Sequence, residues 1–599
     1  MLLHSFDWII LFVFFAVVLG IGLWASKTAG KNQEQFFLGG RSMPWWLLGI
    51  SMVATTFSAD TPNLVTGLVR EGGVARNWVW WSFLITGMVT VFIYARLWRR
   101  SNVLTDLEFY EIRYSGKAAS FLRGFRAIYL GVLFNCLIMG TVTLAAIKIG
   151  SIMFGLSPWI IVVGGSAIVV AYSALGGIKG VIWTDFFQFG IAMAGAFYAA
   201  YVAIDQPEIG SLTALFNHPN LEGKLDLFPN INNPSLVISM FIIPIAVQWW
   251  SVWYPGSEPG GGGYIAQRML AAKDENHAVG ATLLFNVAHY ALRPWPWIIV
   301  ALASLVLYPD LASIHEVFPN IEDQYLGNDI AYPVMLTLLS PGWLGLVTAS
   351  LIAAFMSTIS THLNWGSSYL VHDFYRRFIK PEASDKELVR MGRLSTLLLM
   401  VISGAFALFL LRDATQAFNI LLLSGAGTGA IYLLRWFWWR INAITEVVAM
   451  ISGTITAFVL VLFVSDDAMA TTYIDGFTVK LLLAVCITSV VWIITAFTTR
   501  PESYETLRRF YELTHPGGPG WKKLINESKE RGEEITESQE WSVPQSILMV
   551  FVGCFGTYSA LIGTGSFLYG NYITAGILSL VFIAAVFIIK NHLIKTKFK

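Results

Sequence analysis

Long apolar runs recur along the whole chain and restrict it to folds that exist inside a lipid bilayer. Of 599 residues, 55% are hydrophobic and only 13% are charged, about half the charged share of a soluble protein. About 20 apolar residues span the hydrocarbon core as a helix. The runs lie near 7–25, 46–69, 78–98, 124–153, 157–175, 181–204, 235–255, 276–307, 340–372, 394–411, 415–436, 443–465, 478–498, 544–563 and 570–589. We therefore predict an all-α polytopic membrane protein with about 15 transmembrane helices.

The basic residues predict the orientation of these helices. Cytoplasmic loops carry an excess of Lys and Arg. With the N-terminus outside, nearly all of the 39 basic residues fall in cytoplasmic segments. The exceptions are Arg70, Arg76, Lys224, Arg412 and Lys480, which fall outside, and Lys148 and Arg293, which lie within spans. We expect a multi-pass protein of the plasma or inner membrane, with its first apolar run retained as a helix and its C-terminus in the cytoplasm.

The residue inventory argues against an enzyme. The three cysteines and nine histidines show no metal-ligand spacing, so we expect neither a redox site nor an organic cofactor. The stretch Gly256-Ser-Glu-Pro-Gly-Gly-Gly-Gly263 lacks the Gly-Lys-Ser/Thr ending of a P-loop, and is predicted to be a flexible connection. The polar segment 500–541 is predicted to be a cytoplasmic surface helix. Nothing indicates a nucleic-acid partner; the expected partners are a small solute, Na⁺ and the lipid bilayer.

The second apolar run contains residues that a lipid-facing helix does not tolerate. It reads Ser51-Met-Val-Ala-Thr-Thr-Phe-Ser-Ala-Asp60-Thr-Pro-Asn63, and each unpaired polar group in hydrocarbon costs several kcal/mol. We expect the helix to be interrupted here. Interrupted helices expose carbonyls that coordinate cations and helix ends that hold substrate groups; the alternative is a simple proline kink.

The ninth run carries hydroxyl side chains on one helix face. Ser357, Ser360, Thr361 and Asn364 follow spacings of three, one and three, which place them near one another on a helix. Hard oxygen ligands suit Na⁺. Alternatively, these hydroxyls bond back to their own helix.

Two further groups of residues are candidates for solute binding. His289 and Arg293 lie one turn apart in the eighth run, where a charged Arg needs a partner or an aqueous cavity; solute recognition and a buried ion pair are both open. A tryptophan cluster in the third and seventh runs suits stacking on a sugar or caging a cation, although interfacial anchoring also places tryptophans. Its members are Trp78, Trp80, Trp81, Trp249, Trp250 and Trp253.

Four separated motifs resemble the sodium:solute symporter family, whose members include sodium–glucose, sodium–proline and sialic acid carriers. They are Gly39-Gly-Arg-Ser-Met-Pro-Trp-Trp46 leading into Ser51-Met-Val-Ala-Thr-Thr, Gly176-Gly-Ile-Lys-Gly-Val-Ile-Trp-Thr-Asp185-Phe-Phe-Gln188, Tyr264-Ile-Ala-Gln-Arg268, and Ala353 through Asp373-Phe-Tyr375. The similarity runs from about residue 7 to 465. The glycine-rich stretch before Tyr264 departs from the family's pattern.

The resemblance implies a LeuT-like fold. Two inverted five-helix repeats, about 46–204 and 235–436, would form a transport domain within residues 1–465, after one extra N-terminal helix. Residues 466–599 would add C-terminal helices and the cytoplasmic segment 500–541.

The resemblance also implies sites. The main Na⁺ ligands would be the carbonyls of Ala54, Phe57 and Ala354 with the hydroxyls of Ser357 and Thr358. A second Na⁺ site, present in some relatives, would use Asp185, Ser360 and Thr361. Solute-binding candidates, from the family's positions and from the groups above, are Asp60, Thr61, Trp81, Gln248, Trp249, Trp250, His289 and Arg293.

The resulting hypothesis is a secondary active transporter. It would couple Na⁺ influx to uptake of a small polar solute, such as a sugar, an amino acid or an organic acid, by alternating access. Two alternatives stay open: a solute sensor built on a transporter fold, and coupling to H⁺ instead of Na⁺ through Asp60 or Asp185.

Overall fold

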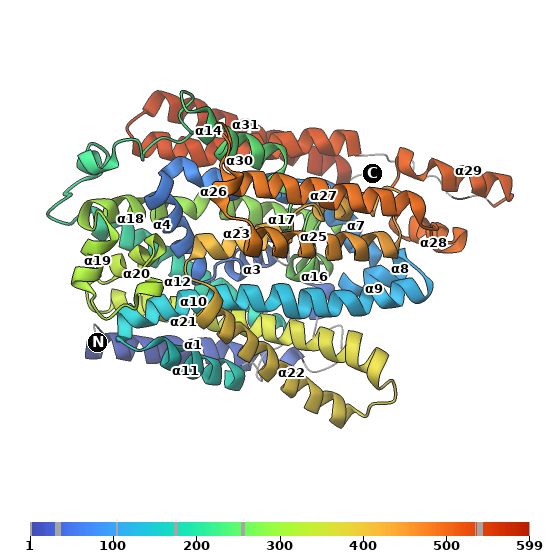
Figure 1. The fold of residues 1–599 in the computed structure, drawn as a ribbon, viewed down its shortest axis with the longest axis horizontal. Helices are drawn as coiled ribbons and strands as arrows, with labels where there is room; N and C mark the ends of the chain where they lie inside the picture. The colour runs from blue at the N-terminus through green and yellow to red at the C-terminus, as the bar shows by residue number, and fades with distance from the viewer. Residues whose placement is uncertain are drawn as a thin grey trace.

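Nearly all of the apolar runs form helices that lie side by side in the computed structural model (Figure 1). The structure describes residues 3–29, 38–103, 106–172, 178–252, 258–533, 535 and 543–597. Within these ranges there is no β-strand, only an isolated bridge between Met43 and Ala272. The motif residues Gly176 and Gly177, and Trp253 of the tryptophan cluster, lie outside the described residues.

Nineteen α-helices in the described part of the chain have eight or more residues. They are α1 (Ser5–Ala29), α3 (Trp45–Thr55), α4 (Asp60–Gly72), α9 (Gly116–Ile128), α10 (Asn135–Phe154), α11 (Pro158–Tyr172), α12 (Ile178–Ile204), α16 (Gly263–Ala271), α17 (Glu275–Val287), α18 (Pro294–Leu307), α21 (Trp343–Ser368), α22 (Asp385–Ala405), α23 (Ala414–Ser424), α25 (Ala443–Phe463), α27 (Gly476–Thr498), α28 (Tyr504–Thr514), α29 (Lys522–Glu530), α30 (Val543–Leu568) and α31 (Tyr572–Lys597).

The predicted apolar runs correspond one by one to helical segments. Within the described ranges, ten helices are long and apolar enough to cross a membrane, some of them continuous through π-helical turns, such as Gly116–Phe154 and Glu275–Leu307. The other five runs fall on shorter apolar helices: Ser5–Ile21, Trp45–Thr55, Pro158–Val169, Pro234–Ala246 and Ala414–Ser424. The prediction of an all-α membrane protein is confirmed, whereas the number of fifteen crossings stays a prediction.

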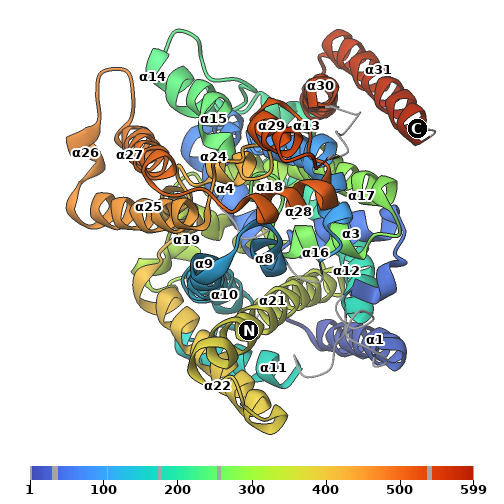
Figure 2. The same ribbon diagram turned by 90° about the vertical axis from the view of Figure 1, so that its right-hand side faces the viewer.

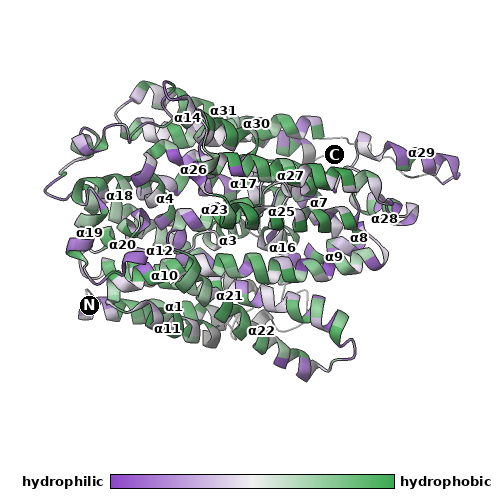
Figure 3. Cartoon of the chain, viewed as in Figure 1, coloured by the Kyte–Doolittle hydropathy of each residue, from purple (hydrophilic) through white to green (hydrophobic). Residues whose placement is uncertain are grey.

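The outer surface of the bundle is apolar where lipid would surround it. Large hydrophobic side chains on the peripheral helices are mostly exposed, among them Phe12, Val163, Phe409 and Phe463. Hydrophilic residues gather toward the two ends of the long helices (Figure 3). A soluble protein rarely exposes apolar patches of this extent, so the arrangement fits a bilayer.

The N-terminal helix braces the helix that carries the predicted Na⁺ ligands. α1 packs against α12 and α21. Asp7 is fully buried, and one of its carboxylate oxygens accepts hydrogen bonds from the backbone N–H groups of Gly342 (2.6 Å) and Gly345 (2.8 Å) at the start of α21. A carboxylate at a helix N-terminus is favourable. At the periphery, α30 and α31 pack mainly on each other (Figure 2).

The second apolar run is interrupted, as its composition predicts. α3 ends at Thr55 and α4 begins at Asp60. The chain between them turns at Phe57, whose N–H donates to the carbonyls of Val53 and Ala54, both at 2.9 Å. Pro62 lies in the first turn of α4, where its missing N–H costs nothing. The interruption leaves helix-end carbonyls in the protein interior, where they need partners.

Arg293 supplies those partners. Its guanidinium donates to the carbonyls of Val53 (3.3 Å) and Thr56 (3.1 Å) and to the Thr56 hydroxyl (2.9 Å). It also lies over the rings of Phe57 and Trp297. Within the described chain, no carboxylate lies at ion-pair distance from Arg293. A cation here is favourable because the C-terminal end of a helix carries partial negative charge.

The glycine-rich stretch, which the sequence predicts to be a flexible connection, lies in the protein interior. Residues 258–263 of the glycine-rich stretch are all buried. The expectation of a flexible connection is therefore wrong for this part. Contacts from four other segments hold it, through Trp98, Asp106, Arg126 and Arg435.

Arg293→Lys tests the role of the guanidinium in the interruption. A lysine keeps the charge but cannot reach the three acceptors in one plane. We expect a loss of about 2 kcal/mol of stability from the unsatisfied buried carbonyls, seen as a lower melting temperature of the detergent-purified protein. The exposed Arg412→Lys is the matched control. Equal melting temperatures for the two variants would contradict this role.

Candidate functional site

A π-helical turn positions His289 beside the interrupted helix. The turn covers Ala288–Leu292, and the Arg293 N–H bonds to the carbonyl five residues back, at Ala288 (3.2 Å). Pro294 follows and lacks an N–H, so the regular helical pattern cannot hold here. The turn brings His289 Nδ1 to 3.2 Å from the Thr56 hydroxyl. Such turns recur at functional sites.

A cavity opens next to this junction, between α4, the segment 80–90, the glycine-rich loop and α17. Its volume is about 60 Å³, enough for a few water molecules. A solute of ten or more heavy atoms needs the surrounding elements to move apart. The lining side chains that carry hydrogen-bonding groups are Thr56, Ser58, Asp60, Thr61, Trp80, Thr86, Thr90, Glu258, Thr282, Asn286, His289 and Tyr290.

Three of the eight predicted solute-binding residues line this cavity: Asp60, Thr61 and His289. The remaining five are not among its lining residues. The Trp81 ring is fully buried, and the Gln248 amide donates to the Val79 carbonyl.

The other three are Trp249, Trp250 and Arg293, and each contacts the backbone or a hydroxyl of another segment. The carbonyl of Trp249 accepts a hydrogen bond from Thr86. The carbonyl of Trp250 lies so close to Gly429 that a methyl group there would overlap it. Arg293 holds the end of α3, as described above. Of the cluster members that the structure describes, only Trp80 lines the cavity, so the others act largely in packing.

Sequence reasoning missed several lining residues. Thr86, Thr90 and Asn286 lie in ordinary-looking apolar runs, and only helical periodicity relative to a known cavity would have singled them out. Glu258 lies in a stretch that the sequence alone marks as a loop. Trp80 stacks on Tyr290 at 5.6 Å between ring centroids, a contact between two distant runs.

Polar atoms around the start of α4 have no protein partner among the described residues. They are Oδ1 of Asp60, both amide atoms of Asn63 and the Thr66 hydroxyl. Buried polar groups are normally hydrogen-bonded, so these atoms are available to water, an ion or a ligand. Asp60, Asn63 and Thr66 follow each other at intervals of three, on one side of α4.

The predicted second sodium site lies where four helices meet. Asp185 on α12 accepts a hydrogen bond from Ser51 (2.8 Å), and Ser357 on α21 lies 3.5 Å from its other oxygen. The Arg268 guanidinium on α16 lies 3.9 Å from Asp185 and donates to Thr55 at 3.1 Å. The Thr55 hydroxyl lies 3.4 Å from Asp185 as well, so three hydroxyls and one cation already surround the carboxylate.

The other predicted sodium ligands lie at the end of α3 (Ala54), in the interruption (Phe57) and on α21, and α3 contacts α21. Phe57, Ala354 and Thr358 are buried, and Ser357 is half-buried. The Ser360 hydroxyl donates to the carbonyl of Ser357 at 3.1 Å, within its own helix. No interaction in the described chain joins Ser360 or Thr361 to Asp185.

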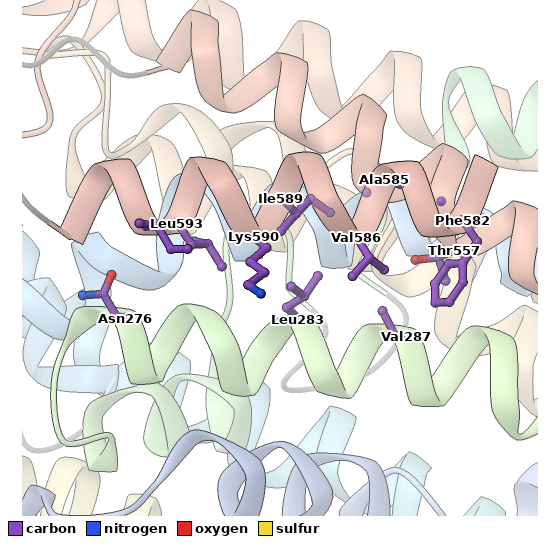
Figure 4. Close-up of a pocket in the computed structure, with 13 residues that line it drawn as sticks. Asn276, Leu283, Val287, Thr557, Phe582, Ala585, Val586, Ile589, Lys590 and Leu593 are labelled. Atoms are coloured by element: carbon purple, nitrogen blue, oxygen red, sulfur yellow. The ribbon is translucent and has the colours of Figure 1, made fainter. Parts of the chain in front are cut away.

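A second cavity, of about 370 Å³, lies between α17, α30 and α31 and shares no lining residue with the central one. Figure 4 shows Val586 and Lys590 of α31 facing Leu283 and Val287 of α17. Its lining is mostly apolar, unlike that of the central cavity.

Comparisons with known proteins match this architecture. The model of the sodium:solute symporter family matches residues 36–453. The "Sodium/glucose cotransporter" of Vibrio parahaemolyticus is 26% identical over 504 residues, covering 81% of this chain and 90% of the relative. "Sodium/glucose cotransporter 1" of Oryctolagus cuniculus is 27% identical over 484 residues, covering 73% and 69%.

A solved structure shows the same fold. The substrate-bound, outward-open state of a Na⁺-coupled sialic acid symporter aligns with a TM-score of 0.63 and 21% identity, covering 84% of this chain and 99% of that one. With the family model matching well over half of the residues, the chain belongs to the sodium:solute symporter family.

Proposed function

We propose that this protein couples Na⁺ influx to uptake of a small polar solute, with the solute held in the central cavity. The observation that carries the proposal is the position of the interrupted helix. Its break at 56–59 borders the cavity at Thr56 and Ser58, and Ala59 lines a further pocket together with Phe355 and other residues of the hydroxyl-bearing helix α21. Ion and solute would thus share one movable element, which is the requirement for coupling.

The proposed main Na⁺ site uses the carbonyls of Ala54, Phe57 and Ala354 with the hydroxyls of Ser357 and Thr358. Support comes from the contact between α3 and α21 and from the burial of Phe57, Ala354 and Thr358. One Na⁺ driven by 100 mV and a tenfold gradient supplies about 2.3 plus about 1.4 kcal/mol. That energy supports roughly a few-hundredfold solute accumulation.

The proposed solute is a neutral, hydroxyl-rich molecule such as a sugar. Two carboxylates, Asp60 and Glu258, line the cavity together with an amide and several hydroxyls, and no Lys or Arg is among the lining residues. Such a lining accepts hydrogen bonds and disfavours an organic acid. Trp80 and Tyr290 offer aromatic faces for a sugar ring. The named relatives are sodium/glucose cotransporters.

For the membrane arrangement, we propose the N-terminus outside and the C-terminus in the cytoplasm, with residues 1–465 forming the transport domain. The two repeats, about 46–204 and 235–436, would be inverted relative to each other. The distribution of Lys and Arg supports this sidedness. The C-terminal helices 466–599 would lie outside the transport domain.

A thermal-shift screen tests ion coupling and solute class together. Purified protein is heated with sugars, amino acids, organic acids or betaines, in NaCl and in KCl at equal ionic strength. We expect a hexose to raise the melting temperature only with Na⁺, because a ligand stabilises the state that binds it. Stabilisation by a solute without Na⁺ but dependent on pH would favour H⁺ coupling, and none with any solute would contradict the proposal.

Thr358→Ala tests the main Na⁺ site. Removing one oxygen ligand should raise the Na⁺ concentration for half-maximal uptake at least about tenfold, equivalent to about 1.4 kcal/mol. Uptake into proteoliposomes is measured over a range of Na⁺ concentrations. Thr396→Ala is the matched control, since that hydroxyl bonds to the Gly392 carbonyl of its own helix. An unchanged Na⁺ dependence in Thr358→Ala would remove this residue from the site.

Asp185→Asn tests a second Na⁺ ion, which we propose to bind near Asp185, Ser360 and Thr361. Loss of the carboxylate charge should lower the Hill coefficient for Na⁺ toward one in the same uptake assay. The exposed Asp310→Asn serves as the control. If the variant keeps a steep parental slope, Asp185 binds no coupling ion and acts only through Ser51 and Arg268.

A further inference from the structure

The glycine-rich loop closes one end of the central cavity. Glu258 and Gly261 line the cavity directly, and Ile265 of the following helix α16 continues the same wall. All residues from Glu258 to Gly263 are buried. Solute in the cavity thus faces this loop, whose glycine-rich sequence departs from the pattern of the family that the sequence resembles.

The loop is packed against its surroundings through its backbone. The indole N–H of Trp98 donates to the carbonyl of Gly260 (2.7 Å), and the N–H of Gly263 donates to Asp106 (3.1 Å). Asp106 is in turn bound by the Tyr369 hydroxyl at 2.7 Å. Two segments therefore contact the loop directly, the end of the span 74–101 and the short helix at Asp106, and a third, at Tyr369, holds Asp106 in place.

Glycine is required at two of these positions. Gly260 and Gly261 have φ values of +85° and +86°, which side-chain-bearing residues rarely adopt. A methyl group on Gly261 would lie 2.7 Å from the terminal carbon of Met269. The closed loop thus depends on glycines, whose backbone also changes conformation most easily.

Charge fixes the loop at its start. The Glu258 carboxylate lies 2.5 Å from Arg126 on α9 and 3.7 Å from Arg435, which follows the short helix α24 (Gly429–Leu434). The same two arginines face Glu446 on α25, at 3.9 and 3.4 Å. Two acids and two bases balance each other in a site where all four are at most 2% exposed.

This cluster lies at the ends of the spans that positive-inside counting assigns to the cytoplasm. Arg126 lies near the start of the apolar run 124–153, and Arg435 lies near the end of the run 415–436. Arg113, on the same side, packs on Phe510 and Trp521 of the segment 500–533. If Glu258 left this buried cluster while the cluster stayed dry, Arg126 and Arg435 would lose part of their charge compensation. The pairing therefore strongly favours the closed position of the loop.

We propose that residues 258–263 form the cytoplasmic gate of the central cavity, and that Glu258 latches it shut by pairing with Arg126 and Arg435. The inference rests on the proposed transport function and its sidedness. Opening moves Glu258 away from the arginines, lets water hydrate all of the charges, and gives the solute a path past Gly261. The glycines absorb the backbone change.

Cysteine labelling tests the gate without any solute. The three native cysteines are replaced, and Thr90→Cys places a thiol in the cavity, next to Gly261. A membrane-impermeant methanethiosulfonate reagent is applied to inside-out or right-side-out vesicles in Na⁺-free KCl buffer. We expect Glu258→Gln to speed labelling from the cytoplasmic side on the order of tenfold, and not from the outer side.

Matched controls separate the latch from general loosening. Glu275→Gln removes the charge from a half-exposed pair with Arg100 (2.8 Å) and should leave the rate unchanged. Gly261→Ala strains the closed loop and should act like Glu258→Gln, whereas Gly190→Ala, with open space around its added methyl group, should not. The glycine pair also serves if Glu258→Gln does not fold.

Parental labelling rates in every folded latch variant, or an equal rise from both sides, would overturn the gate. Because the assay contains neither Na⁺ nor solute, a failed gate is distinguishable from a failed transport function. The latter is read separately, from the Na⁺ dependence of solute-induced stabilisation.

Discussion

The backbone interruption between Thr55 and Asp60 is the constraint on which the rest of the structure depends. A helix that stops inside a bilayer leaves carbonyl and N–H groups that lipid cannot satisfy. Arg293 and Thr61 hold the carbonyl of Thr56, while Asp60 and Asn63 begin the second half with polar atoms that lack protein partners. The interruption is thus stabilised by Arg293 and Thr61 on one side and borders the central cavity on the other.

Three acids of this region lie on different elements. Asp185 on α12 lies 3.9 Å from Arg268, Asp60 at the start of α4 lines the cavity, and Glu258 of the glycine-rich loop pairs with Arg126 and Arg435. In the proposed function, ion and solute are coupled through the interrupted helix, which borders the cavity at Thr56 and carries Ser51, a hydrogen-bond partner of Asp185.

Hydropathy and residue type alone predicted the all-α class, a helical segment at each apolar run and the interruption near Asp60. These features follow from the bilayer, which imposes length and polarity rules on every span. The cavity was predicted only in part: Asp60, Thr61 and His289 line it, whereas Trp81 and Gln248 lie behind it. The burial of Glu258 was missed because glycine-rich loops resemble linkers until the packing around Trp98 and Arg126 is known. The spacing of residues predicts which side chains share one face of a helix. It does not predict which faces of different helices pack against each other.

Equilibrium binding of ²²Na⁺ to the purified protein tests the central claim most directly, since it requires no knowledge of the solute. At constant ionic strength in choline chloride, the account predicts saturable binding that unlabelled Na⁺ displaces and K⁺ does not, and that is lost when Ser357 and Thr358 are both replaced by alanine. Absence of saturable binding, or full binding in that double variant, would contradict a sodium site between the interrupted helix and α21.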